Sequence, residues 1–281
     1  MVLWKNTNLC DNFENMHPVI QHILSRKGQK VPINDGRKIV LVLFGGLMTG
    51  VRGASVAIAF QDLGISYSFD SIYSASAGFL NASYMLSDNP RLGTSIYYDD
   101  LSGHKFLNFF RLWNVANIDY MINVFKNTKP IHTKNVWDAK TKLYVRLSNL
   151  KKHRPEYVEI HDYKPEDFFD IAKASVAIPY LHPGAIKIGD RYCKDGEFTD
   201  ADCAETINYV LASDATDILV VYNRPKQKII NLPKSDRVYE ICPATDWKLS
   251  RFETNTEKLK KACIQMGNKI MTEFGGGEFK I

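Results

Sequence analysis

The stretch RKIVLVLFGGLMTGVRGASVAIAFQDLG (37–64) determines the expected fold. It begins with a nearly continuous run of aliphatic and β-branched residues, which is typical of a strand buried on both faces of a parallel sheet. A glycine-rich turn follows at Gly45–Gly50, and apolar residues then recur at helical spacing from Val51 until Gly64 ends the pattern. The stretch therefore predicts a strand, a tight turn and a helix in succession.

A second unit of the same kind follows it. FDSIY (69–73) predicts a strand, SASAG (74–78) a sharp turn, and residues 79–86 a helix rich in small side chains. Two such units in tandem predict an α/β fold: a three-layer sandwich whose central, mostly parallel sheet is flanked by helices. Further strands are expected at 143–147, 186–193, 217–222 and 237–242.

The carboxyl-terminal part predicts one long helix and a tail. Thr254 and Glu257 have the spacing of a capping box, and apolar residues then follow on one helical face. The glycine-rich residues 274–281 predict a flexible tail. The apolar residues of the helical face are Leu259, Cys263, Met266 and Ile270.

Composition is that of an ordinary globular protein. The chain has 281 residues, of which 45% are hydrophobic and 24% charged, and we expect one domain at 37–281 with residues 1–36 packed on it as an extension. The longest apolar run, Ile39–Phe44, is far shorter than the ~18 residues of a membrane-spanning helix. The amino terminus has no secretory-signal pattern, and five cysteines without a C-x-x-C spacing favour reduced thiols. These features predict a cytoplasmic protein.

Charge and aromatic residues are unevenly distributed. The net charge is +5, yet residues 126–154 contain nine Lys or Arg and one acid, Asp138. Such a segment can contact an anionic membrane surface, or it can be a solvated face. Residues 106–125 hold six aromatic side chains, which suits either a cap over an acyl pocket or core packing. We therefore expect a cap and lipid-facing region at about 95–165, peripheral membrane contact, and no binding of nucleic acid.

Ser76 stands where a catalytic serine could be placed. A serine between a strand and a helix adopts strained backbone geometry and needs small residues at −2 and +2, positions that Ser74 and Gly78 occupy. The same pattern also occurs in turns that only serve packing. The turn at Gly45, Gly46 and Leu47 offers backbone N–H groups that suit an oxyanion, or is a plain connection. It lacks residues that a dinucleotide or Walker loop requires.

A serine nucleophile needs a base, and histidine is a poor candidate in this chain. In the order of an α/β-hydrolase triad the histidine comes late in the chain, yet the last histidine is His182, and no strong acid-then-His pair in the expected context accompanies it. The other histidines lack the spacing of metal ligands. Asp195-Gly196 places a carboxylate on a tight loop, although Asp-Gly is also a common turn signal.

These motifs together resemble the patatin-like phospholipases. LVLFGGLMTG (41–50) is similar to their strand and oxyanion turn, YSASAGFLNASY (73–84) to their nucleophile elbow, and ASVAIPYLHPGAIKIGDRYCKDGE (174–197) to the segment with their catalytic Asp. Residues 239–267 resemble the carboxyl end of bacterial-type members. The resemblance extends over most of the chain from about Arg37.

The resemblance implies a Ser–Asp dyad without histidine. Ser76 would be the nucleophile, Asp195 the general base, and Gly45, Gly46 and Leu47 the oxyanion hole, with no metal or organic cofactor. The family's turn is usually Gly-Gly-Gly-x-Arg-Gly, so Leu47 and Thr49 are departures. Ser74 and Glu197 also stand where the family commonly has small residues, often glycine.

Three functions follow as hypotheses. The first is a serine hydrolase that cleaves fatty-acyl esters of lipids through an acyl-enzyme. The second is a catalytically impaired lipid-binding or regulatory protein, since the side chain of Leu47 restricts the turn. The third is a soluble esterase that acts on small acyl esters.

Overall fold

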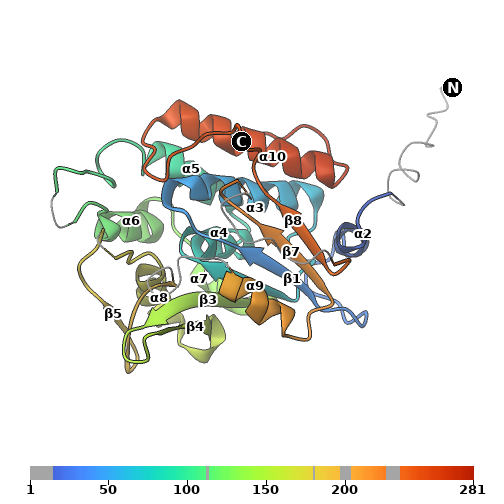
Figure 1. Cartoon of the computed structure of the whole chain (residues 1–281), viewed down its shortest axis with the longest axis horizontal. Helices are drawn as coiled ribbons and strands as arrows, with labels where there is room; N and C mark the ends of the chain where they lie inside the picture. Colours follow the sequence, from blue (N-terminus) through green and yellow to red (C-terminus); the bar gives the residue numbers. More distant parts are fainter. Residues whose placement is uncertain (1–14, 112–113, 180, 197–203, 226–234) are drawn as a thin grey trace.

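The computed structural model describes residues 15–111, 114–179, 181–196, 204–225 and 235–281. Within these residues an eight-stranded mixed sheet lies between helices, as the sequence predicts (Figure 1). The strands are β1 (Ile39–Leu43), β2 (Ser71–Ala75), β3 (Lys142–Asn149), β4 (Arg154–Glu159), β5 (Ile186–Ile188), β6 (Arg191–Asp195), β7 (Asp217–Val221) and β8 (Val238–Ile241).

Strand β1 is the centre of the sheet and is buried on both faces. Ile39, Leu41 and Leu43 belong to the larger hydrophobic cluster, whereas Val40 and Val42 belong to a smaller one on the opposite face. This alternation is the period of two that a strand imposes on its side chains. Strands β3, β2, β1, β7 and β8 are parallel neighbours in that order.

Helices cover the two faces unequally. Helices α3, α4, α5 and α10 contribute to the larger cluster, and α9 packs Ile207 and Val210 on the smaller one. The α-helices are α2 (Pro18–Ser25), α3 (Val51–Leu63), α4 (Ala77–Leu86), α5 (Pro90–Asp99), α6 (Ile118–Asn123), α7 (Thr133–Asp138), α8 (Phe168–Ser175), α9 (Ala204–Leu211) and α10 (Thr256–Glu273). Shorter helical turns are η1 (Leu47–Gly50), η2 (Val124–Thr128), η3 (Ile160–Asp162) and η4 (Pro165–Asp167).

Strand β3 has two partners along one edge. Its residues 142–146 pair with β2, and the next residues, 147–149, pair with β6. Both partners must lie on the same edge, because β4 occupies the other edge over 144–149. The end of β6 therefore meets the end of β2 beside β3.

Three local predictions differ from the structure. The strand expected at 186–193 is a hairpin of β5 and β6, which turns at Gly189 with a φ of 58°. Helix α10 is capped by the side chain of Asn255, which accepts from the N–H of Lys258 at 3.0 Å, in place of the expected capping box. The carboxyl-terminal tail, expected to be flexible, packs against α10. The Phe279 ring contacts Gly267 so closely that a Cβ added to Gly267 would lie 2.3 Å from the ring. The predicted buried face of α10 is confirmed, because Leu259, Cys263, Met266 and Ile270 are all buried.

The region expected to form a cap divides into two parts. Its helical part, from α5 to α7, ends at Asp138, and residues 142–159 belong to the sheet as β3 and β4. In the amino-terminal extension, Val19, Ile20 and Ile23 of α2 are buried in the larger cluster. Residues of α4, α5 and α6 line the candidate site together with the turn that follows β1.

Candidate active site

Ser76 occupies a strained turn between β2 and α4. Its φ is 50° and its ψ is −127°, a combination that costs a non-glycine residue of order 1–3 kcal/mol. Gly78 makes the turn possible, because a Cβ there would lie 2.2 Å from the carbonyl oxygen of Leu43. The Ser76 hydroxyl makes no capping hydrogen bond to α4. A strained serine whose hydroxyl serves no local bond is the geometry expected of a nucleophile elbow.

The glycine-rich turn lies directly against this serine. A Cβ at Gly45 would be 2.4 Å from the Cβ of Ser76 and 3.1 Å from its Oγ. Gly46 has a φ of 145° and Leu47 a φ of 52°. The N–H groups of these three residues donate no hydrogen bond to any described part of the chain. Consecutive N–H groups without a partner beside a serine are what an oxyanion requires.

Side chains from distant segments hold the turn in place. Asn223, 3% exposed, donates from Nδ2 to the carbonyl oxygens of Phe44 at 2.5 Å and Gly45 at 3.0 Å. The Thr49 hydroxyl donates to the Gly46 carbonyl oxygen at 2.8 Å. The Thr49 side chain thus helps to fix the shape of the turn. Asn223 was not predicted, because nothing local in the sequence links it to this turn.

Asp195 is the last residue of β6, the strand that pairs with β3 just beyond the end of β2. Ala75 is opposite Arg146, and Asp195 is opposite Leu147, the next residue of β3. Strands β2 and β6 share one edge of β3, so their ends are neighbours. Ser76 follows the last residue of β2, and it therefore lies near Asp195 at the end of β6. Asp195 is completely buried, and its N–H donates to the carbonyl oxygen of Ala177 at 3.4 Å. Glu197 lies outside the described residues.

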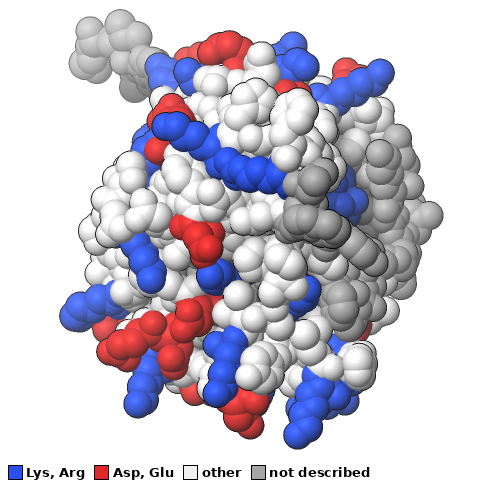
Figure 2. Space-filling model, turned by 90° about the vertical axis from the view of Figure 1, so that its left-hand side faces the viewer, with Lys and Arg blue, Asp and Glu red and all other residues white. Residues whose placement is uncertain are grey.

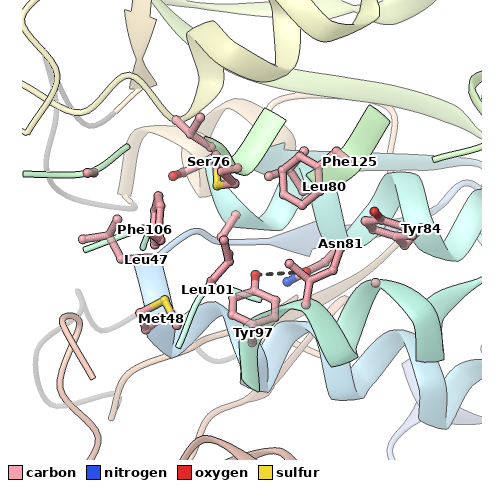
Figure 3. A pocket seen from close by; sticks show the side chains of 16 residues that line it. Leu47, Met48, Ser76, Leu80, Asn81, Tyr84, Tyr97, Leu101, Phe106 and Phe125 are labelled. Carbon is pink, nitrogen blue, oxygen red and sulfur yellow. Dashed lines mark hydrogen bonds between the residues drawn. The ribbon is translucent and has the colours of Figure 1, made fainter. Parts of the chain in front are cut away.

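A narrow apolar cavity extends from Ser76 along α4 (Figure 3). Its space, counted together with the open solvent at its mouth, is about 540 Å³. Ser76, Leu80 and Tyr84 line it at a spacing of four residues, so it follows the helix for about 12 Å at 1.5 Å per residue. The remaining lining residues are mostly apolar and come from the 47–48 turn, α5, α6, η2 and the segments that flank them. An elongated apolar slot that begins at a serine fits a linear hydrocarbon chain.

One polar pair interrupts the apolar lining. The Tyr97 hydroxyl donates to Oδ1 of Asn81 at 3.1 Å, and Nδ2 of Asn81 donates to the Gly50 carbonyl oxygen at 2.9 Å. Burial raises the pKa of the Tyr97 hydroxyl, which keeps it protonated as a donor. These bonds satisfy both side chains and join α4, α5 and the start of α3 beneath the cavity.

The described residues contain no cluster of three His, Cys, Asp or Glu side chains that could hold a metal ion. No helix among the described segments is long and apolar enough to cross a membrane.

The basic segment is largely neutralised by ion pairs. Five of its nine cations contact a carboxylate: Lys129, Lys134, Lys142, Arg146 and Lys152. On the face drawn in Figure 2, Lys and Arg side chains are scattered among Asp and Glu side chains and uncharged residues. The nine cations and one acid of this segment give a net charge of +8. Because carboxylates from other segments pair with several of these cations, that number overstates the charge that the segment presents to solvent.

Comparisons with known proteins include a solved structure of similar fold. A family model described as a domain of unknown function, DUF6363, matches residues 216–274. No curated protein sequence matches the chain. The crystal structure of VipD from Legionella pneumophila is similar with a TM-score of 0.51 and 12% identity, over 85% of this chain and 67% of that one. That of the type III effector protein ExoU has a TM-score of 0.44 and 12% identity, over 87% of this chain and 53% of that one.

The likeness to VipD shows a shared α/β fold. At this identity it assigns no role to any residue of this chain.

Proposed function

We propose that this protein is a serine hydrolase of fatty-acyl esters that works through Ser76 and Asp195. The observation that carries the proposal is the position of Ser76. It lies in a strained elbow, beside three N–H groups without a partner in the described chain, at one end of a long apolar cavity. The patatin-like resemblance of the three motifs supports the same function.

The reaction follows from these positions. Asp195 takes the proton of the Ser76 hydroxyl as Oγ attacks the ester carbonyl carbon, and the N–H groups at Gly45, Gly46 and Leu47 stabilise the oxyanion. The alcohol then leaves with a proton from Asp195, and the acyl group remains on Ser76. Water, deprotonated by Asp195, attacks this ester, and the fatty acid leaves as Asp195 returns the proton to Oγ of Ser76. The cavity holds the acyl chain throughout, so the hydrocarbon is kept out of water.

A surface for lipid contact adjoins the cavity. Phe106 lines the cavity, and Phe109 and Phe110 of the same segment are 59% and 92% exposed. The Phe109 ring packs against Phe252 with centroids 5.3 Å apart. Exposed aromatic side chains beside an apolar opening are typical of proteins that enter a lipid interface. We propose that this aromatic surface, rather than the basic segment, contacts the membrane.

One observation favours a second function. Leu47 has a φ of 52°, a left-handed conformation that disfavours residues with a Cβ. If this strain moves its N–H away from Ser76, the protein would bind acyl chains without hydrolysing them. This second candidate keeps the cavity and loses only the turnover.

Release of fatty acids separates the two functions. We would incubate the protein with phospholipid and neutral-lipid extracts, and measure free fatty acids by mass spectrometry for the wild type, Ser76→Ala and Asp195→Asn. Ser87→Ala is the matched control, since Ser87 follows α4 and lies outside the cavity. The hydrolase predicts release by the wild type and Ser87→Ala, and loss in the other two variants. Acyl binding by all four proteins without release would support the second candidate and contradict hydrolysis.

A further inference from the structure

A second cleft lies next to the glycine-rich turn. Leu47 and Met48 of the turn line the apolar cavity, whereas Thr49, the next residue, and Arg52, at the start of α3, line this cleft. It encloses about 1500 Å³, open solvent at its mouth included, and is bounded mainly by residues 245–253. The turn therefore contributes to both the apolar cavity and a cleft that is lined by several cations.

The cleft is strongly basic. Its lining residues include one carboxylate, Glu253, and five cations. Glu253 already accepts the N–H groups of Thr254 and Asn255 through Oε1, and its Oε2 lies 3.5 Å from Nζ of Lys258. The five cations are Arg52, Arg224, Lys248, Arg251 and Lys258. The side chains of Arg224 and Lys248 have no hydrogen bond or ion pair within the described chain.

Arg52 is a buried cation at the base of this cleft. It is 1% exposed, and it donates to the carbonyl oxygens of Asn223 at 2.9 Å and Trp247 at 2.5 Å. Its Nε has no hydrogen-bond partner in the described structure, and no carboxylate forms an ion pair with it there. Burial lowers the pKa of Arg52 to about 10, so the guanidinium still carries its charge at neutral pH.

A buried cation without a counter-ion is costly, and proteins normally pair such a group. Among the described residues, the hydrogen-bond partners of the Arg52 side chain are backbone carbonyl groups alone. An anion held in the cleft by Arg224 and Lys248 would supply the missing negative charge. Arginine and lysine side chains together are the groups that proteins use to bind phosphate.

We propose that this cleft is a binding site for a phosphate-bearing anion, with Arg224 and Lys248 as its direct contacts and Arg52 as the buried charge beneath it. The site is separate from the proposed dyad and does not depend on hydrolysis. It is joined to the oxyanion turn through Arg52, which bonds to the Asn223 carbonyl, and through Arg251, whose carbonyl accepts the Met48 N–H at 3.2 Å.

Binding of inorganic phosphate tests the proposal directly. Isothermal titration calorimetry at constant ionic strength, with chloride as the reference anion, would compare the wild type with Arg224→Gln/Lys248→Gln. The control, Lys151→Gln/Arg154→Gln, removes the same two charges from exposed positions of the basic segment. Urea unfolding of each variant verifies that it is folded, and a Ser76→Ala background removes any contribution from catalysis.

We expect saturable binding whose Kd rises about tenfold or more in the cleft variant, because two charge-assisted hydrogen bonds are lost. The control is expected to bind as the wild type does. Absence of saturable binding, or equal affinity of the cleft variant and the control, would overturn the proposal.

Vesicles distinguish the two sources of phosphate. Sedimentation with phosphatidylcholine vesicles, with and without phosphatidic acid, would be repeated in the presence of inorganic phosphate. Binding that needs phosphatidic acid, is displaced by phosphate and is lost in the cleft variant assigns the site to a lipid headgroup. Phosphate binding that depends on the cleft, with vesicle binding unchanged in the cleft variant, assigns it to a soluble phosphate compound.

Discussion

Substitution of Gly45 by alanine should separate catalysis from folding. The added Cβ would lie 2.4 Å from the Cβ of Ser76, whereas carbon atoms pack at about 3.5 Å or more. The Ser76 side chain must therefore move by about 1 Å relative to the oxyanion turn. A displacement of this size costs about 100-fold in rate, which equals about 2.7 kcal/mol of transition-state stabilisation.

The assay is hydrolysis of a long-chain p-nitrophenyl ester, with urea unfolding of the same preparations. Overpacking at this site should lower the free energy of unfolding by about 1–3 kcal/mol, and circular dichroism would verify the fold. Gly277→Ala is the matched control, because a Cβ there would meet no atom within 4 Å. A folded Gly45→Ala protein with unchanged kcat/KM would refute the placement of Ser76 against this turn.

Three further predictions concern other parts of the molecule. Leu47→Gly should raise kcat/KM for the same ester, because glycine adopts the φ of 52° without strain; a fall would show that the leucine side chain is needed in the cavity. Phe109→Ser/Phe110→Ser should weaken sedimentation with phosphatidylcholine vesicles while hydrolysis of a soluble short-chain ester stays unchanged, and unaltered sedimentation would exclude the aromatic surface as the lipid contact. Asp35 pairs with the buried Arg26 at 2.7 Å, which lowers the pKa of Asp35 to about 2. The ion pair contributes about 1–2 kcal/mol to the free energy of unfolding, a value that allows for solvent screening. This contribution is present above pH ~4 and is lost as the pH falls toward ~2, because Asp35 becomes protonated. The difference in unfolding free energy between the wild type and Asp35→Asn, measured by urea unfolding, should therefore shrink over that range, and a constant difference would contradict the assignment.

Two features could be predicted from sequence because their pattern in the sequence is local. The small residue Gly78, two positions after Ser76, indicated the sharp turn, and the structure shows that a Cβ there would meet the carbonyl oxygen of Leu43. That contact is itself long-range, because Leu43 lies 35 positions earlier in the chain. The burial of β1 follows from its own aliphatic run.

Long-range contacts could not be predicted in this way. The position of Asp195 depends on β6 pairing with the edge of β3 that β2 leaves free. In the sequence, a common Asp-Gly turn signal and the patatin-like resemblance pointed to that residue. Asn223 and Arg52 meet through the fold, 171 positions apart in the chain. The turn at Gly189, by contrast, had a local signal in Gly189-Asp190 that the prediction of a single strand overlooked.

Covalent labelling of Ser76 tests the central claim most directly. A fluorophosphonate reacts much faster with a serine that is activated as a nucleophile beside an oxyanion hole than with an ordinary serine, and the mass of the intact protein reports the adduct. The account predicts one adduct per chain, mapped by peptide mass spectrometry to Ser76, absent in Ser76→Ala and strongly reduced in Asp195→Asn. A folded wild-type protein that remains unlabelled, or an adduct at another residue, would contradict it.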